Sequence, residues 1–257
     1  MTINQAFEIL KNAGGIRAAR IITDNMPHIG RLRVWWIARA LRRDVPVAKI
    51  IHQKWFYGLK FYTNKYTLDP RPDTETLVES VIADAPNTPN ILDIGTGTGC
   101  IIAALVENIS DAHGVGTDIS RGAIRVARRN IRNLGLDNKI NIIRASFNNP
   151  RALREKFDII VSNPPYIAHN DKRVDAGAKH DPDIALYAGN NGNAAYEQIA
   201  KNAKNWIKPN GKIYLEIGKG AMRTVRKIFH DEGWTFIRAD RDLSGIPRIL
   251  VFNISSK

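Results

Sequence analysis

The residues best suited to take part in a chemical reaction follow directly on an apolar run. Residues 157–161 (FDIIV) read as a buried strand, and one residue later the chain continues with Asn163, Pro164, Pro165 and Tyr166. Proline cannot donate a backbone hydrogen bond and its φ is fixed, so this strand end is predicted to be rigid. The Asn163 side-chain oxygen and the Pro164 carbonyl are acceptors that can hold an NH2 group, and the Tyr166 ring can cover a planar one.

A glycine-rich loop ends an earlier apolar run. Residues 91–100 read ILDIGTGTGC, and the candidate ligand-binding positions are Asp93, Gly95, Thr96, Gly97, Thr98 and Gly99. Glycine lets the backbone approach a ligand where a Cβ atom would collide, and the helix predicted from Cys100 points its first amides at that ligand. The spacing is neither the G-x-G-x-x-G of dinucleotide sites nor a Walker loop, because no Gly-Lys-Ser/Thr follows.

Two carboxylates beside this loop favour a particular nucleoside ligand. Asp93 would repel a pyrophosphate but suits a ligand that carries an amino group. Asp118 lies 23 residues after Gly95 at the end of the next strand, where an acidic side chain accepts hydrogen bonds from ribose hydroxyls. S-adenosylmethionine (AdoMet) has an ammonium and a sulfonium group and no phosphate. The loop and Asp118 therefore predict an AdoMet site.

Together the two motifs predict methyl transfer to a planar nitrogen. An NH2 group on an sp² carbon is a poor nucleophile because its lone pair is delocalised, and a side chain cannot deprotonate it first. Acceptors at Asn163 and Pro164 would aim the lone pair at the methyl carbon, and proximity and orientation supply the rest. No general base is required. The nitrogen could belong to adenine, guanine or a glutamine amide, and the motif does not choose among them.

A sheet is needed to position these motifs. From Asn90 on, apolar strand candidates alternate with helices such as 123–134 and 193–206. The strand candidates read NILDIG, GVGTDI, KINIIRA, FDIIVS and GKIYLEIG, followed by WTFIRADR and RILVFNI. This alternation predicts an α/β fold with a doubly wound, mostly parallel seven-stranded sheet and ligands at the carboxyl ends of its strands.

The beginning of the chain follows another pattern. Residues 2–45 have helical spacing of apolar positions, with expected breaks at Gly14–Gly15 and Met26-Pro27. The apolar positions are Ile3, Phe7, Leu10, Leu32, Trp35, Trp36, Ala40 and Leu41. Residues 55–64 (WFYGLKFYTN) predict a β-hairpin, and LDPRPDTE is a proline-stiffened linker into a helix. We expect a helical, substrate-recognising domain with a hairpin at 1–68 and a methyltransferase domain at 69–257.

Charge and composition restrict the partners and the surroundings. The net charge is +13, and residues 1–68 hold 12 Lys and Arg against 3 Asp and Glu, which is +9. This excess favours an acidic partner, either a protein surface or nucleic acid. Cys100 is the only cysteine, so there is no internal disulfide, and the six histidines lack metal-ligand spacing. No apolar run approaches the roughly 20 residues of a membrane span. We expect a cytoplasmic monomer without a metal.

The chain closely resembles the HemK-like family of peptide chain release factor glutamine methyltransferases. The resemblance covers roughly residues 45–257, with a helical region of similar kind before it. It is carried by PVAKIIHQKWFYGLKFY, LDPRPDTETLVE, ILDIGTGTGC, GTDIS, IVSNPPYI, DPDIALYAGNNG, GKIYLEIG and DLSGIPRILV. General DNA and RNA methyltransferases lack the PRPDTE linker, so this linker and NPPY together are more specific than either alone.

The resemblance implies roles for individual residues. Gly95 to Gly99 and Asp118 would hold AdoMet, Phe147 would pack on its adenine, and Asn163 to Tyr166 would hold a glutamine amide. The implied substrate is the glutamine of the Gly-Gly-Gln loop in bacterial class-one release factors, methylated on its side-chain nitrogen. The helical N-terminal domain would help to bind the release factor.

Several positions depart from the family pattern. Ser146 stands where the family commonly has Asp, and Asp69 replaces a usually apolar linker residue. His180-Asp181-Pro182 replaces a usual Glu-Pro, and Ala221 stands where glutamine is common. None of these positions belongs to NPPY or to the glycine loop. The loop at 167–192 could order over the substrate.

Three alternatives to release-factor methylation are considered. The chain could methylate a glutamine of a ribosomal protein, or an amino group of a nucleic-acid base, which the basic charge and NPPY favour. Against nucleic acid, the sequence shows no helix-turn-helix, zinc finger or target-recognition domain, and a base in a duplex would have to be flipped out. Against a non-catalytic AdoMet-binding module, Asn163 and the glycine loop are intact.

Overall fold

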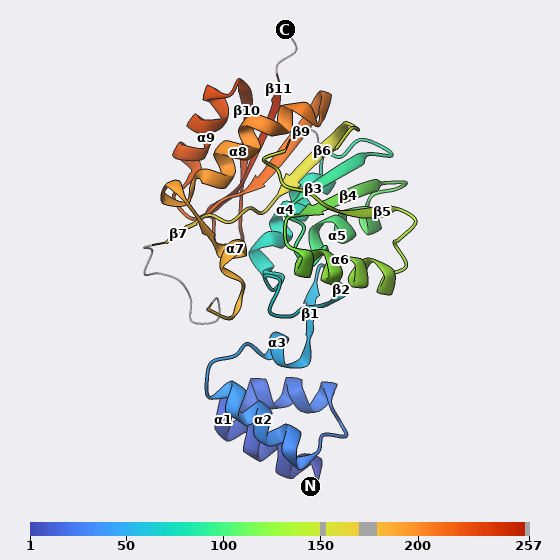
Figure 1. Cartoon of the computed structure of the whole chain (residues 1–257), viewed down its shortest axis with the longest axis vertical. Helices are drawn as coiled ribbons and strands as arrows, with labels where there is room; N and C mark the ends of the chain where they lie inside the picture. Colours follow the sequence, from blue (N-terminus) through green and yellow to red (C-terminus); the bar gives the residue numbers. More distant parts are fainter. Residues whose placement is uncertain (150–152, 170–178, 255–257) are drawn as a thin grey trace.

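The computed structural model describes residues 1–149, 153–169 and 179–254. The chain begins with three helices that lie at one end of the molecule (Figure 1), α1 (Ile3–Asn25), α2 (Arg31–Leu41) and α3 (Val47–Ile51). Thr2 and Gln5 form a capping box that starts α1. Gly15 has φ 85° and ψ 167°, so α1 is broken at the predicted glycine pair.

The helices bury a different face of α2 from the one suggested by its tryptophans. Leu10 of α1 packs with Val34, Ile37 and Leu41 of α2 in a separate small core. Trp35 and Trp36 are 53% and 59% exposed, although the predicted helical pattern rested partly on them. The helix α2 has two overlapping apolar faces, and the face that packs against α1 is the one with the smaller, aliphatic side chains.

The predicted hairpin is present as β1 (Gln53–Phe56) and β2 (Leu59–Tyr62). Phe56 and Phe61 are almost fully buried in the core that also contains α4 (Glu75–Ile82) of the following part. Asn130 of α6 (Arg121–Asn133) binds both backbone groups of Tyr62: its Oδ1 accepts from the Tyr62 nitrogen at 2.8 Å, and its Nδ2 donates to the Tyr62 carbonyl oxygen at 2.9 Å. The hairpin is therefore attached to the larger part of the molecule by both apolar packing and hydrogen bonds.

The predicted seven-stranded sheet is confirmed, with the order β10-β11-β9-β6-β3-β4-β5. Every neighbouring pair is parallel except those of β11, which runs antiparallel to both β10 and β9. The strands are β3 (Asn90–Ile94), β4 (His113–Asp118), β5 (Ile140–Arg144), β6 (Phe157–Ser162), β9 (Ile207–Glu216), β10 (Trp234–Arg241) and β11 (Pro247–Ile254). The strand that ends in NPPY, β6, lies next to β3, which ends in the glycine loop.

Helices cover both faces of the sheet (Figure 1). They are α4 (Glu75–Ile82), α5 (Cys100–Asn108), α6 (Arg121–Asn133), α7 (Asp183–Leu186), α8 (Ala194–Asn202) and α9 (Met222–Asp231), with 3-10 turns η1 (Pro72–Thr74), η3 (Asn190–Gly192) and η4 (Ala203–Asn205). Side chains alternate along each strand. Ile91 of β3 therefore packs in the core under α4, α5 and α6, whereas Leu92 packs in the core under α8 and α9.

A short parallel pair that the sequence did not predict lies after NPPY. β7 (Ile167–Ala168) pairs with β8 (Tyr187–Ala188), so the chain returns to the NPPY turn after the loop. Residues 170–178 of the loop that could order over the substrate lie outside the described residues. Within the described ranges, no helix is both long enough and apolar enough to cross a bilayer.

Candidate active site

A cavity of about 340 Å³ opens at the carboxyl ends of the central strands. This volume falls in the range of small-molecule sites. Its wall includes the predicted residues Gly95, Thr96, Gly97, Thr98, Asp118, Phe147, Asn163 and Pro165. Further parts of the wall come from residues 66–71 of the linker region and from Ile184, Ala185, Tyr187 and Ala188. The structure thus brings the glycine loop and NPPY to one cavity, as the parallel order of β3 and β6 requires.

The glycine loop has a backbone that other residues would adopt only under strain. Gly95, Gly97 and Gly99 have φ values of 77°, 55° and 81°. The Gly95 and Thr96 nitrogens both donate to the Thr117 oxygen, at 2.9 and 2.8 Å. The loop therefore folds back onto the end of β4, and Gly95 and Gly97 line the cavity without a Cβ. Gly99 does not line the cavity, because a Cβ there would point at Ala127 of α6, 3.5 Å away.

Asp118 is held in a fixed orientation at the end of β4. Its Oδ2 accepts from the Gly97 nitrogen at 3.1 Å, and its Oδ1 accepts from the Ser120 nitrogen at 2.8 Å. Burial raises the pKa of Asp118, and the backbone donors lower it. A carboxylate that lines the cavity and is anchored in this way suits ribose hydroxyls, which are hydrogen-bond donors.

Asp93 lies behind the loop and does not line the cavity. Its Oδ2 accepts from the Thr96 hydroxyl at 2.6 Å, and its buried Oδ1 has no hydrogen-bond partner in the described structure. Burial raises the pKa of Asp93 to about 7, and the negative charge of Asp118 adds to this rise. Two neighbouring acids with an unpartnered oxygen fit a positively charged ligand and disfavour an anionic one. The residues present therefore fit AdoMet.

Phe147 and Ser146 lie in the part of the wall where the adenine of AdoMet is predicted. Phe147 lines the cavity and packs against the core under α8 and α9. Ser146, a departure from the family pattern, also lines the cavity, and its Oγ accepts from the Asn148 nitrogen at 3.2 Å. The serine hydroxyl therefore caps its own turn.

Asn163 is oriented by a residue of the linker. Its Nδ2 donates to the Thr74 hydroxyl at 3.1 Å, and among the described residues no group donates to its Oδ1. Since Asn163 lines the cavity, an acceptor oxygen is available there. Pro165 also lines the cavity, and Pro164 is buried.

Tyr166 lies outside the cavity wall. A Cβ added to Gly218 would meet the Tyr166 ring at 3.0 Å, so the ring packs on the Gly218 backbone. Burial, followed by the negative charge of Glu216, raises the pKa of Tyr166. Gly192 has φ 88°, and a Cβ there would lie 2.4 Å from the backbone carbonyl oxygen of Tyr166. Only glycine lets the returning chain approach the NPPY turn this closely.

Glu216, at the end of β9, is a buried acid that sequence reasoning did not identify. It is 2% exposed, and its Oε2 has no hydrogen-bond partner in the described structure. Burial raises its pKa to about 7, although Thr74, Arg248 and Asn163 lower it. The LEIG motif that contains Glu216 served only as a family marker, and nothing in its spacing indicated that the acid lies beside Asn163.

The polar residues of the PRPDTE linker each contact a different distant element. Thr74 binds Asn163, and Arg71 binds Asp181 at 2.8 Å. Asp73 pairs with Arg248 of β11 at 2.9 Å, and Glu75 accepts from the Tyr57 nitrogen of the hairpin turn at 2.9 Å. The linker therefore joins the hairpin, the sheet and the NPPY turn, which its proline content alone did not predict.

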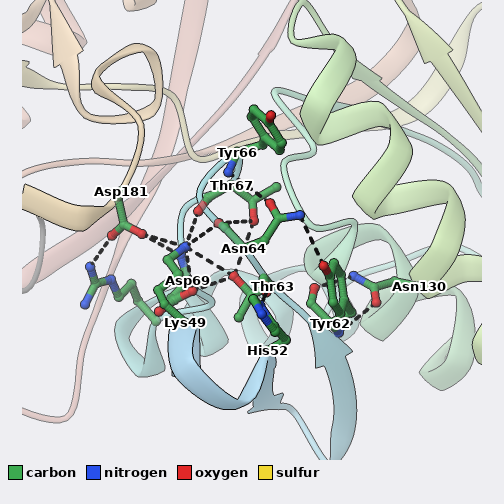
Figure 2. Close-up of polar contacts among 11 residues, drawn as sticks. Lys49, His52, Tyr62, Thr63, Asn64, Tyr66, Thr67, Asp69, Asn130 and Asp181 are labelled. Atoms are coloured by element: carbon green, nitrogen blue, oxygen red, sulfur yellow. Dashed lines mark hydrogen bonds and ion pairs between the residues drawn. The ribbon is translucent and has the colours of Figure 1, made fainter. Parts of the chain in front are cut away.

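Two other departures from the family pattern lie together. Asp69 and Asp181 both pair with Lys49 of α3, at 2.8 and 2.9 Å (Figure 2). Ala221, the remaining departure, precedes α9 and packs partly buried against the adjoining core. Asp69 and Asp181 are far apart in the sequence, so only the fold reveals that they share a counter-ion.

Comparison with known proteins agrees with this architecture. Residues 68–180 match the family described as methyltransferase small domain. A crystal structure of a methyltransferase from Pyrococcus furiosus is similar, with a TM-score of 0.59 and 17% sequence identity over 86% of this chain and 96% of that one. The fold is that of the Rossmann-like methyltransferases.

Relatives of higher identity define the family. A release factor glutamine methyltransferase of Bradyrhizobium diazoefficiens is 41% identical over 79% of this chain and 70% of its own. Another, of Cereibacter sphaeroides, is 35% identical over 95% of this chain and 88% of its own. The chain belongs to the release factor glutamine methyltransferase family. It is also 38% identical over 84% of its length to a bifunctional methyltransferase of Rickettsia conorii, but spans only 46% of that protein.

Proposed function

We propose that this chain transfers a methyl group from AdoMet to the side-chain amide nitrogen of the glutamine in the Gly-Gly-Gln motif of peptide chain release factors. The observation that carries the proposal is the Asn163 side chain, whose nitrogen is bound to Thr74 while its oxygen stays available in the cavity. The names of the Bradyrhizobium and Cereibacter relatives support the substrate.

AdoMet would be held by the glycine loop, with Asp118 accepting from its ribose hydroxyls and Phe147 against its adenine. Asp93 lies buried behind the loop, and in its ionised form its negative charge would favour the positive charge of the ligand. When bound, AdoMet supplies an electrophilic methyl group on a sulfonium centre. The glycines let the ligand approach the backbone closely, and the hydrogen bonds from the loop to Thr117 and Asp118 keep that backbone in place.

Asn163 and Pro164 would act on the incoming amide. Their oxygens accept its two N–H groups, which orients the nitrogen lone pair away from the turn and favours a pyramidal nitrogen. The nitrogen would form a bond to the methyl carbon as the bond from that carbon to the sulfonium sulfur breaks, the neutral thioether would leave, and the nitrogen would then lose one proton to solvent. Because Thr74 fixes the Asn163 amide and the prolines fix the turn, little reorganisation is needed during the reaction.

The N-terminal helices supply a surface for the protein substrate. Leu32, Trp35 and Trp36 of α2 are exposed, and residues 1–68 carry a charge of +9. Tryptophan and arginine are the side chains most often dominant in protein interfaces. A basic surface with exposed aromatic rings fits an acidic release factor, and its association should weaken as salt rises.

The decisive experiment offers several substrates to one enzyme preparation. The chain is incubated with methyl-labelled AdoMet and, separately, with release factor, ribosomal proteins, tRNA and DNA. We expect label on release factor alone, and none on a release-factor variant in which the glutamine of the Gly-Gly-Gln motif is replaced by alanine. Label on DNA or tRNA instead would favour a nucleic-acid amino methyltransferase, and label on ribosomal protein would favour the other glutamine substrate.

A further inference from the structure

A single buried ammonium group lies in a cage of oxygens next to the cavity. The Lys49 side chain is 6% exposed, and its Nζ donates to the Thr63 hydroxyl at 3.2 Å and to the Asn64 and Thr67 carbonyl oxygens. The same Nζ pairs with one carboxylate oxygen each of Asp69 and Asp181 (Figure 2). Five oxygens around one nitrogen exceed the three donors of an ammonium, so the cage binds Lys49 largely as a compact point charge.

The five oxygens come from separate stretches of chain. Residues 63–67 lead out of the hairpin, Asp69 belongs to the linker, and Asp181 lies beyond the NPPY turn. Residues 66–71, which include the start of the linker, line the cavity, and so do Ile184, Ala185, Tyr187 and Ala188, which follow Asp181. The Lys49 ammonium is therefore shared by two parts of the cavity wall that are distant in sequence.

Charge explains why these parts stay together. The Asp69 and Asp181 side chains are 8% and 2% exposed, so both carboxylates have lost most of their water. Lys49 and Arg71 balance them, but Arg71 is 39% exposed and reaches only Asp181. Without Lys49 the two carboxylates would face one another in a buried place with one partly solvated counter-ion, and they would separate or draw in water.

We infer that Lys49 is a positioning residue for the AdoMet cavity, whose ammonium holds the linker at 67–71 and the segment at 181–188 together as its wall. The inference rests on the proposed function, since it assumes that AdoMet occupies this cavity. It also means that α3, which packs against α1 and α2, contributes to the shape of the cofactor site. Lys49 itself does not line the cavity, so it acts through Asp69 and Asp181.

The test uses the full chain with Lys49→Ala, and with Lys60→Ala, an exposed lysine of the neighbouring strand β2, as the control. Calorimetry without any protein substrate should show AdoMet binding weakened at least about tenfold in Lys49→Ala, which corresponds to 1.4 kcal/mol. Hydrogen exchange without ligand should become faster at 67–71 and 181–188 while the amides of β3 and β6 keep their protection. Lys60→Ala should match the unmodified chain in both measurements.

Chemical rescue identifies the ammonium as the acting group. n-Propylammonium replaces the atoms that Lys49→Ala removes, so it should restore part of the AdoMet affinity, whereas n-propanol at the same concentration should not. Rescue by neither compound would overturn the assignment, as would a folded Lys49→Ala variant with unchanged affinity and exchange.

If Lys49→Ala does not fold, Lys49→Arg decides. Its planar fork cannot place one nitrogen among five oxygens, so we expect a folded protein with weaker AdoMet binding, and unchanged binding would overturn the inference. An unmodified chain that binds AdoMet but methylates no release factor would contradict the proposed function and leave this test valid.

Discussion

Replacing Glu216 with glutamine should change how the folding stability of the chain depends on pH, while it leaves the size of the side chain unchanged. Glu216 is 2% exposed at the end of β9, and its Oε2 has no hydrogen-bond partner in the described structure. The charged and titratable groups around it are Asp73, Arg248, Tyr166 and Tyr196. Burial raises the pKa of Glu216 by more than Arg248 lowers it, so the ionised form is disfavoured in the folded state.

The magnitude follows from the pKa of Glu216, which rises from 4.5 to about 7 on folding. An acid with a raised folded pKa stabilises the fold fully below its unfolded pKa, and this contribution is lost as pH rises through the folded pKa. A rise of about 2.5 units at 1.36 kcal/mol per unit amounts to roughly 3 kcal/mol. The glutamine variant has no charge to bury. Its stability relative to the unmodified chain should therefore improve by that amount between about pH 4 and about pH 8.

Urea unfolding of both chains across this pH range measures the difference directly. Asp93 also has a raised pKa, but it is present in both chains, so its contribution cancels. Glu107→Gln, at an exposed position of α5, is the control and should show no such trend. A Glu216→Gln difference that stays constant with pH would refute the reasoning, because Glu216 would then be equally well solvated in the folded and unfolded states.

Three further substitutions test the site and the partner surface. Asn163→Ala should lower turnover by about 10²-fold or more and leave AdoMet affinity close to that of the unmodified chain; loss of AdoMet binding would instead indicate a structural role. Replacing both Trp35 and Trp36 with alanine should raise the KM for release factor by about tenfold or more without changing the melting temperature, and an unchanged KM would place the docking surface elsewhere. In Gly116→Ala the new Cβ would lie 2.7 Å from Ile142 Cδ1 and 2.9 Å from the Thr96 hydroxyl. Thermal unfolding should show a loss of about 1–3 kcal/mol, and an unchanged melting temperature would contradict this packing argument.

Local sequence patterns were sufficient wherever a structure depends on neighbouring residues. The apolar runs predicted all seven strands of the sheet, and Gly14–Gly15 predicted the break in α1. NPPY could be placed at the carboxyl end of a strand because proline stops a ladder within a residue or two. The proximity of this turn to the glycine loop followed from the alternation of strands and helices, since parallel neighbours end at the same edge.

Other features could not be predicted because they depend on contacts between distant residues. The hydrophobic period of α2 is compatible with two faces, and only packing against α1 decides that Trp35 and Trp36 are exposed. Asn130 reads as an ordinary helix residue, yet it binds Tyr62 and the Thr98 carbonyl at 2.9 Å, and so connects the hairpin to the glycine loop.

The sequence by itself determined the class of fold, the loop that fits a nucleoside and the rigid acceptor turn, since each is encoded in a few consecutive residues. Only the tertiary structure decided which polar groups surround them. Asp69 and Asp181 read as separate departures from a family pattern, but in the fold they share the Lys49 ammonium. A buried charge is stable only with a partner of opposite sign, and the tertiary fold decides which residue lies close enough to be that partner.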